Sequence, residues 1–301
     1  MILLAPTADL ARHILSTQDV LISCEAEYGS YVAEGRLYTA AHHQPAGTKY
    51  AGTHVGGSRP APCNDVNIPV VAGDGLILIS HVDLDTLGGC LRARGNRALF
   101  AEAFQPFWDL AEYVDTHGFH KLAESGADAP TTRALYAYTA WASTHGLGRL
   151  SGTVTDVTAY IAEAAEVLQR ILDRSDPDLY EAGVAFEAAG AALNRATFSR
   201  WEGHIILRVT TQERQFCNHM YSDPAGVAGV AVACFNPFSG TVTISLAEPV
   251  EGVSCRAILQ ELWGREAGGH DGSAGSPRGM KMTDQDFQDA VAGLASKLSQ
   301  A

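Results

Sequence analysis

The sequence predicts an α/β fold: an N-terminal domain with helices on a mostly parallel sheet, a helical connector, and a smaller C-terminal α/β domain. Three observations lead to this expectation. Residues 76–80 form an apolar run typical of a buried strand. Residues 156–173 and 178–200 are long segments with helical patterns. Beyond residue 203, strand patterns and helical patterns alternate, as in α/β domains.

The N-terminal part begins with a short predicted helix at residues 8–16. Two strands follow at 20–27 and 31–40, and Gly29 with Ser30 predicts a hairpin turn between them. Further helices are expected after the 76–80 strand, at residues 98–112, 131–144, 156–173 and 178–200. We place the domain boundary at residues 201–203, which gives a metal-binding domain with its helical connector at 1–203 and a substrate-binding domain at 204–301.

The second domain is expected to contain three strands and two helices. The strands are predicted at residues 204–210, 227–235 and 241–246, and the helices at 254–263 and 284–298.

Composition limits the class of protein. A chain of 301 residues with 46% hydrophobic content is long enough for about two domains with buried cores. A formal net charge of −13 argues against a basic nucleic-acid-binding surface. A local cluster of arginines and backbone amides could still hold a small nucleotide. Six scattered cysteines, with no C-x-x-C pair, suggest reduced thiols. With neither a signal peptide nor a membrane span recognisable, we expect a cytoplasmic protein without membrane partners; the sequence leaves the oligomeric state open.

The first candidate site follows the apolar run, where the chain reads HVDLDTLGG. His81, Asp83 and Asp85 alternate, so an extended segment would direct all three to one side. An imidazole with two carboxylates is a donor set suited to Mn²⁺, Fe²⁺ or Zn²⁺, and Gly88 with Gly89 suits a tight turn or a close backbone approach. The alternative is a solvated loop in which Asp85 caps the next helix.

The second candidate site is a glycine-rich stretch near the C-terminus, GGHDGSAGSPRG. Backbone N–H groups in such a loop can approach an anion closely. Gly268, Gly269 and His270, with Arg278, are therefore candidates for binding a phosphate. The alternative is a flexible surface turn.

These two motifs, in this order, resemble the DHH phosphoesterase superfamily with its DHH-associated C-terminal domain. The resemblance runs from about residue 76 to the C-terminus. It implies a hydrolase that uses Mn²⁺, or Zn²⁺ or Fe²⁺. Its substrate would be a small phosphorylated molecule of the nucleotide type or a short oligonucleotide, bound in a cleft between the domains.

The chain departs from the pattern of that superfamily in its second metal-binding motif. An adjacent Asp-His-His is expected there, but this chain has DTHGFH, in which Asp115 with His117 or His120 could supply ligands from a strand end. The lone aspartate expected between the motifs is not recognisable, and Ala247 stands where the family often has an arginine. An adjacent histidine pair, His42 and His43, does follow a short apolar run earlier in the chain and offers alternative donors.

The motifs and the resemblance together assign three roles. The expected metal ligands are His81, Asp83, Asp85, Asp115, His117 and His120, with His42 and His43 as further candidates. The expected catalytic residues are Asp85, Asp115 and His117. The expected substrate-binding residues are Gly268, Gly269, His270 and Arg278.

The sequence also leaves two other functions open. The split second motif would suit a protein that binds metal or nucleotide without hydrolysing it. A related glycine-rich domain also occurs in some tRNA editing proteins, which would make the chain an aminoacyl-ester hydrolase; its acidity and its lack of an HxxxH motif with a distant CxxxH argue against this.

Overall fold

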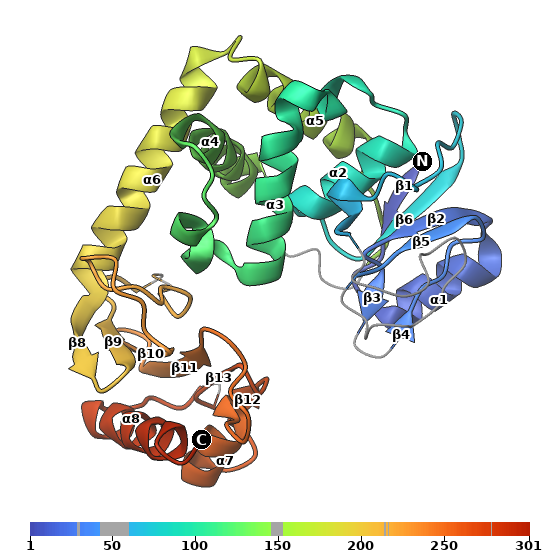
Figure 1. Cartoon of the computed structure of the whole chain (residues 1–301). Helices are drawn as coiled ribbons and strands as arrows, with labels where there is room; N and C mark the ends of the chain where they lie inside the picture. The colour runs from blue at the N-terminus through green and yellow to red at the C-terminus, as the bar shows by residue number, and fades with distance from the viewer. Residues whose placement is uncertain (29–30, 43–59, 146–152, 214, 216, 278) are drawn as a thin grey trace. The chain divides into compact units, whose positions relative to one another are not determined.

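A computed structural model describes residues 1–28, 31–42, 60–145, 153–213, 215, 217–277 and 279–301 (Figure 1). The chain divides into two compact units, Met1–Phe186 and Glu187–Ala301. The division falls within the long helix α6 (Pro177–Thr197), upstream of residues 201–203 where the sequence suggested a boundary. Each unit contains a sheet and helices, so the α/β class is confirmed.

The first unit is built on a five-stranded sheet in the order β5-β2-β6-β1-β7. Its strands are β1 (Ile2–Leu4), β2 (Val20–Cys24), β5 (Tyr38–Ala40), β6 (Leu76–Ile79) and β7 (Thr155–Asp156). β2 runs parallel to β5 and β6, and β6 runs parallel to β1, while β7 is antiparallel at one edge. Because neighbouring parallel strands end at the same edge of a sheet, the carboxyl ends of β5, β2 and β6 lie side by side.

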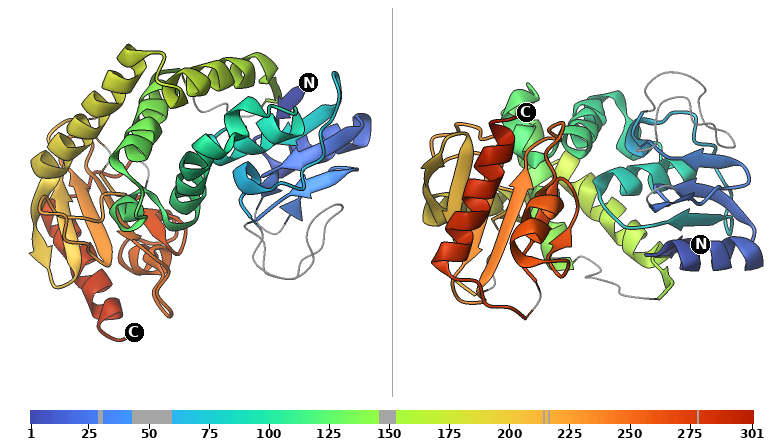
Figure 2. Two further views of the ribbon diagram at one scale, coloured as in Figure 1. Left: turned by 45° about the horizontal axis from the view of Figure 1, so that its top comes forward. Right: turned by 90° about the horizontal axis from the view of Figure 1, so that it is seen from below.

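Helices cover both faces of this sheet, as expected for a parallel sheet (Figure 2). α1 (Ala8–Thr17) buries Ala11 and Ile14 against one face. The other face carries the larger core, formed with α2 (Leu84–Ala93), α3 (Gln105–His117), α4 (Ala129–His145) and α5 (Thr158–Leu172). Short 3-10 turns connect these elements: η1 (Pro62–Asn64), η2 (Ala98–Phe100), η3 (Glu102–Phe104) and η4 (Phe119–Glu124).

Two expectations for the first unit are wrong. The hairpin of residues 20–27 with 31–40 is reduced to the short pair β3 (Glu27–Tyr28) and β4 (Tyr31–Val32), and its turn at residues 29–30 lies outside the described residues. β2 and β5 instead pair in parallel, which buries both strands in the main sheet.

The second error concerns the segment that leads to Asp115. A strand end was expected there, but α3 continues to His117. Phe107, Trp108, Leu110 and Ala111 are buried at helical spacing, so the apolar residues before Asp115 belong to a helix face.

The second unit contains a six-stranded sheet in the order β12-β13-β11-β10-β9-β8. Its strands are β8 (Phe198–Glu202), β9 (Ile205–Val209), β10 (Ala231–Asn236), β11 (Thr241–Leu246), β12 (Gly268–Gly269) and β13 (Ser273–Gly275). α7 (Cys255–Trp263) and α8 (Asp284–Leu298) pack on one face. The predicted strands and helices of this unit are confirmed in type and order, whereas β8 occupies residues expected to end a helix and start a linker.

In the described residues, no helix is both long and apolar enough to cross a membrane.

Candidate metal centre

The carboxyl ends of β2, β5 and β6 each deliver one polar side chain to the same edge of the sheet. Glu25 follows β2 directly, His42 lies two residues beyond β5, and His81 lies two residues beyond β6. Asp85 comes from the first turn of α2 and Asp115 from the last turns of α3. Segments far apart in the sequence therefore converge at the carboxyl ends of the strands, which is where open α/β sheets bind their ligands.

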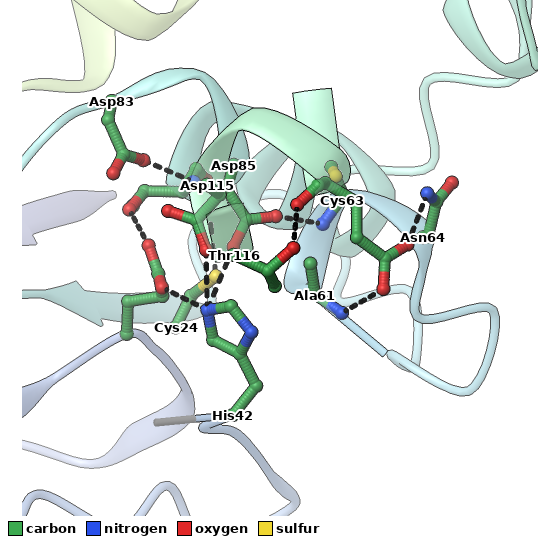
Figure 3. A network of polar contacts seen from close by, with 12 residues as sticks. Cys24, His42, Ala61, Cys63, Asn64, Asp83, Asp85, Asp115 and Thr116 are labelled. Atoms are coloured by element: carbon green, nitrogen blue, oxygen red, sulfur yellow. Dashed lines mark hydrogen bonds and ion pairs between the residues drawn. The ribbon is translucent and has the colours of Figure 1, made fainter. Parts of the chain in front are cut away.

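His42 lies at the middle of a buried group with three carboxylates (Figure 3). Its Nε2 is 2.8 Å from Glu25 Oε1, 3.1 Å from Asp115 Oδ2 and 3.5 Å from Asp85 Oδ2. The side chains of His42, Glu25 and Asp85 are almost fully buried, and that of Asp115 is 17% exposed. One imidazole nitrogen can donate one hydrogen, so it cannot satisfy three carboxylates at once.

Glu25 connects this group to a second, more exposed one. Its Oε2 lies 3.6 Å from His81 Nε2, and that nitrogen is 2.9 Å from Asp83 Oδ2. Thr86 Oγ1 donates a hydrogen bond of 2.6 Å to Glu25 Oε2 and so fixes the carboxylate. The backbone of Glu25 has φ +47°, a conformation that non-glycine residues adopt rarely and that is common at functional sites.

Asp83 caps α2 and holds part of the second group in place. Its Oδ1 accepts a hydrogen bond of 2.8 Å from the N–H of Thr86. Asp83, and not Asp85, is therefore the N-cap, and Asp85 is left in the first turn, where its buried carboxylate faces the centre.

Asp85 is oriented by the turn η1. The Cys63 N–H donates a hydrogen bond of 2.7 Å to Asp85 Oδ1, which leaves Oδ2 directed at the centre. The turn packs against α2 so closely that a Cβ on Gly88 would stand 2.3 Å from Cys63 Cβ, and one on Gly89 would stand 2.8 Å from Pro62 Cβ. The two glycines of the motif thus serve the predicted close backbone approach, inside a helix and not in a tight turn.

α3 braces the same turn one helical turn before Asp115. Glu112 accepts hydrogen bonds from the N–H of Ala61 at 3.2 Å and from Asn64 Nδ2 at 2.7 Å. Figure 3 shows these contacts beside the centre. One helix therefore supplies Asp115 and also fixes the turn that orients Asp85.

The charges of the centre perturb one another strongly. Burial raises the pKa of Asp85 well above its usual range, and the charge of Glu25 adds to this. Burial would lower the pKa of His42, but its polar contacts with Asp115 and Glu25 outweigh burial and raise it to about 10. The hydrogen bond with Asp83 raises the pKa of His81 to about 9, against the opposing effect of burial. Without a metal, the imidazolium of His42 is the cation that balances the buried carboxylates.

The donor set fits a divalent metal ion. Among the described residues, Asp85 Oδ2 and Asp115 Oδ2 are buried and accept no hydrogen bond of regular geometry, a costly state for carboxylate oxygens. Atoms of Glu25, His42, Asp85 and Asp115 that could bind a metal lie within 4.8 Å of one another, and so do those of Glu25, His81 and Asp83. Three carboxylates with an imidazole suit Mn²⁺, Fe²⁺ or Zn²⁺.

The structure brings together five of the predicted ligands: His42, His81, Asp83, Asp85 and Asp115. It does not bring His117 into either group. On a helix, residues two apart point to nearly opposite sides, and the exposed His117 ring stacks on Tyr113 with centroids 4.3 Å apart.

Within the described part of the chain, His120 belongs to neither group. It lies in η4, after Gly118 (φ +84°) turns the chain away from the end of α3. His43 lies outside the described residues.

The glycine-rich stretch forms a short hairpin in the second unit. β12 pairs with β13, joining Gly268 with Gly275 and Gly269 with Ala274. The His270 N–H donates to the Ser273 carbonyl at 2.7 Å, so this amide is occupied within the hairpin, while the residue itself is exposed. Arg278 lies outside the described residues, and the role of this stretch in binding substrate stays a prediction.

Glu25 is the residue that sequence reasoning missed. The signal was present: an acidic residue directly follows the apolar strand that ends at Cys24, in the same way that His81 follows β6. Only the order of the strands in the sheet makes these two ends neighbours.

No protein-family model and no curated protein matches the chain. Among solved structures, it is similar to exonuclease RecJ bound to manganese, with a TM-score of 0.36 and 13% identity over 98% of this chain and 79% of that one. RecJ in complex with Mn²⁺ from Thermus thermophilus is similar with a TM-score of 0.34 and 12% identity, over 97% of this chain and 47% of that one. An uncharacterized protein from Helicobacter pylori is similar with a TM-score of 0.20 and 12% identity, over 74% of this chain and 69% of that one. These TM-scores are low, so the function proposed below rests on the geometry of the centre.

Proposed function

We propose that this chain is a metal-dependent phosphoesterase of the DHH type, which hydrolyses a small phosphorylated substrate of the nucleotide kind. The observation that carries the proposal is the convergence of Glu25, His42, Asp85 and Asp115 on one buried point. Manganese is the ion we propose, because carboxylate oxygens with imidazole suit it well.

The buried and the exposed residues of the centre would have different roles. Glu25, Asp85 and Asp115, with His42, would hold an ion, and Glu25 could share a second ion with His81 and Asp83. A bound divalent ion lowers the pKa of a water molecule and neutralises phosphoryl oxygens. His81 has a half-exposed side chain, so it can lose its Nε2 proton to solvent when an ion binds there.

The second unit would contribute the substrate site. Gly268, Gly269, His270 and Arg278 remain our candidates for binding the phosphate. This part of the proposal rests on the density of glycine and the cationic side chains, which together suit an anion.

The test uses the full chain, freed of metal with a chelator and then supplied with Mn²⁺. Hydrolysis of bis(p-nitrophenyl) phosphate, p-nitrophenyl phosphate and a short end-labelled oligonucleotide is measured together with the metal content. We expect hydrolysis of at least one of these to depend on Mn²⁺. Asp115→Asn should weaken Mn²⁺ binding at least about 100-fold, since loss of an outer-shell partner alone typically costs about 10- to 100-fold.

The matched control is Asp109→Asn on the same helix. Asp109 is exposed and its Oδ1 accepts a hydrogen bond from Gln105 Nε2, so the change should leave metal content and hydrolysis intact. Hydrolysis that survives chelation, or that Asp115→Asn leaves unchanged, would contradict the proposal. Tight metal binding without hydrolysis of any substrate would favour a non-catalytic binding protein.

A further inference from the structure

The outer face of the second unit's sheet, opposite α7 and α8, carries a cluster of polar and thiol side chains. β9 and β10 run parallel with Arg208 paired to Cys234, and side chains alternate along a strand. Arg208 and Cys234 therefore lie side by side on this outer face. The described residues of the segment that follows β9 (211–213, 215 and 217–222) cover them and place Cys217 against Cys234.

The two thiols are close enough to form a bond after a small movement. Their Sγ atoms are 3.5 Å apart, and both cysteines are free and buried. A disulfide needs about 2.05 Å between the sulfurs. Cys234 is fixed within β10, while Cys217 lies in a segment without helix or strand, so the approach would come from Cys217.

A buried cation favours the thiolate form of Cys217. Arg208 is fully buried, and it donates to the neutral groups Asn194 O, Asn194 Oδ1, Thr197 Oγ1, Met220 O and Ser222 O. Within the described residues, no carboxylate forms an ion pair with it. The hydrogen bond between the two thiols, helped by the charge of Arg208, lowers the pKa of Cys217 despite burial, while burial raises the pKa of Cys234.

We propose that Cys217 and Cys234 are a peroxide-sensitive thiol pair, in which Cys217 is oxidised first and Cys234 resolves it as a disulfide. The Cys217 thiolate attacks one oxygen of hydrogen peroxide, the O–O bond breaks, and hydroxide leaves as sulfenic acid forms. The Cys234 thiol then loses its proton and attacks the Cys217 sulfur, so that the S–S bond forms and the S–O bond breaks. In total, two thiols and one peroxide give one disulfide and two waters.

The bond would tie the covering segment to the sheet. That segment is already held by Arg208, and by Ser245 and Asn236, which contact the carbonyls of Asn218 and Glu213. A covalent link between residues 217 and 234 limits the unfolded chain, so the oxidised second unit should melt at a higher temperature. This inference does not depend on the metal centre.

The molecule contains its own comparison pair. Cys24 and Cys90 are also buried and share a hydrogen bond, but Cys24 lies within β2 and Cys90 within α2. Linking these two sulfurs would require a strand or a helix to move, whereas Cys217 lies outside any helix or strand. The 217–234 disulfide should therefore form first.

The experiment treats the reduced full chain with hydrogen peroxide and follows intact mass and non-reduced peptide maps over time. We expect a loss of two hydrogens and a 217–234 linked peptide before any link between residues 24 and 90. Cys234→Ser should instead accumulate sulfenic acid on Cys217, trapped by dimedone, and Cys217→Ser should form no fast adduct. The inference is overturned if residues 24 and 90 link first or equally fast, or if the sulfenic acid forms on Cys234. The wild-type map decides even if a variant fails to fold.

Discussion

Binding of a metal at the centre should release protons, and its affinity should rise steeply with pH. The perturbation is a titration of the metal-free chain with Mn²⁺ between pH 6.5 and 8.5. Over this range His42 is protonated, because its pKa is raised to about 10. An imidazole nitrogen cannot hold a proton and a metal ion together, so His42 must lose its proton when Mn²⁺ binds.

The size of the effect follows from the pKa. At pH 7.5, displacing a proton from a group with a pKa of about 10 costs about 3 kcal/mol, or about 300-fold in apparent affinity. Each proton released should strengthen apparent binding about tenfold per pH unit. His81 can add a second proton, since its pKa is raised to about 9, although half-exposure of its side chain weakens the effect.

Without metal, the folded protein should lose stability as pH rises, which is opposite in direction to the rise in Mn²⁺ affinity. His42 has a raised pKa in the folded state, so it stabilises the metal-free protein fully below its unfolded value of about 6.5. That contribution is lost as pH rises from about 6.5 to about 10. Asp85 acts in the same direction, because its raised pKa makes folding less favourable once the carboxyl must ionise.

Calorimetry in two buffers of different ionisation enthalpy gives the number of protons released at pH 7.5, and melting curves with and without Mn²⁺ give the stability. We expect at least one proton, and a metal-dependent gain in melting temperature that grows with pH. His42→Gln should remove one proton from the count. An affinity for Mn²⁺ that is flat from pH 6.5 to 8.5, with no proton released, would refute this account of the centre.

Two further changes separate metal binding from folding. Asp83→Asn keeps an acceptor for the Thr86 N–H and should weaken Mn²⁺ binding with little change in melting temperature. Asp83→Ala should weaken Mn²⁺ binding too and also lower the free energy of unfolding by about 1 kcal/mol, because the helix loses its cap. Equal melting temperatures for the two variants would contradict the capping role. Gly88→Ala should cost about 1–3 kcal/mol and weaken Mn²⁺ binding, because the new Cβ would displace Cys63 and with it the amide that orients Asp85. The control Gly190→Ala has no neighbour within 4 Å in the middle of α6 and should stabilise the helix by about 0.5–1 kcal/mol, as measured by chemical denaturation.

Local sequence patterns predict the elements with strong periodicity and those residues of the centre that are close together in the chain. The apolar run before His81 predicted β6, and the alternating His81, Asp83 and Asp85 predicted polar side chains at its end. These predictions need only the spacing of neighbouring residues, because a strand or a helix is defined by local backbone geometry. The C-terminal strands and helices were predictable for the same reason.

Which distant residues complete the centre depends on how the strands and helices pack. Glu25 and His42 lie close to Asp85 because β5, β2 and β6 are neighbours in a parallel sheet. The periodicity of a single segment does not predict the order of strands in a sheet. Asp115 reaches them from a helix that sequence reasoning had ended too early, since an apolar run of a few residues fits a strand or a helix equally well. The same helix directs His117 to another side. Local patterns set which residues can bind a metal, and the packing of strands and helices sets which of them share one.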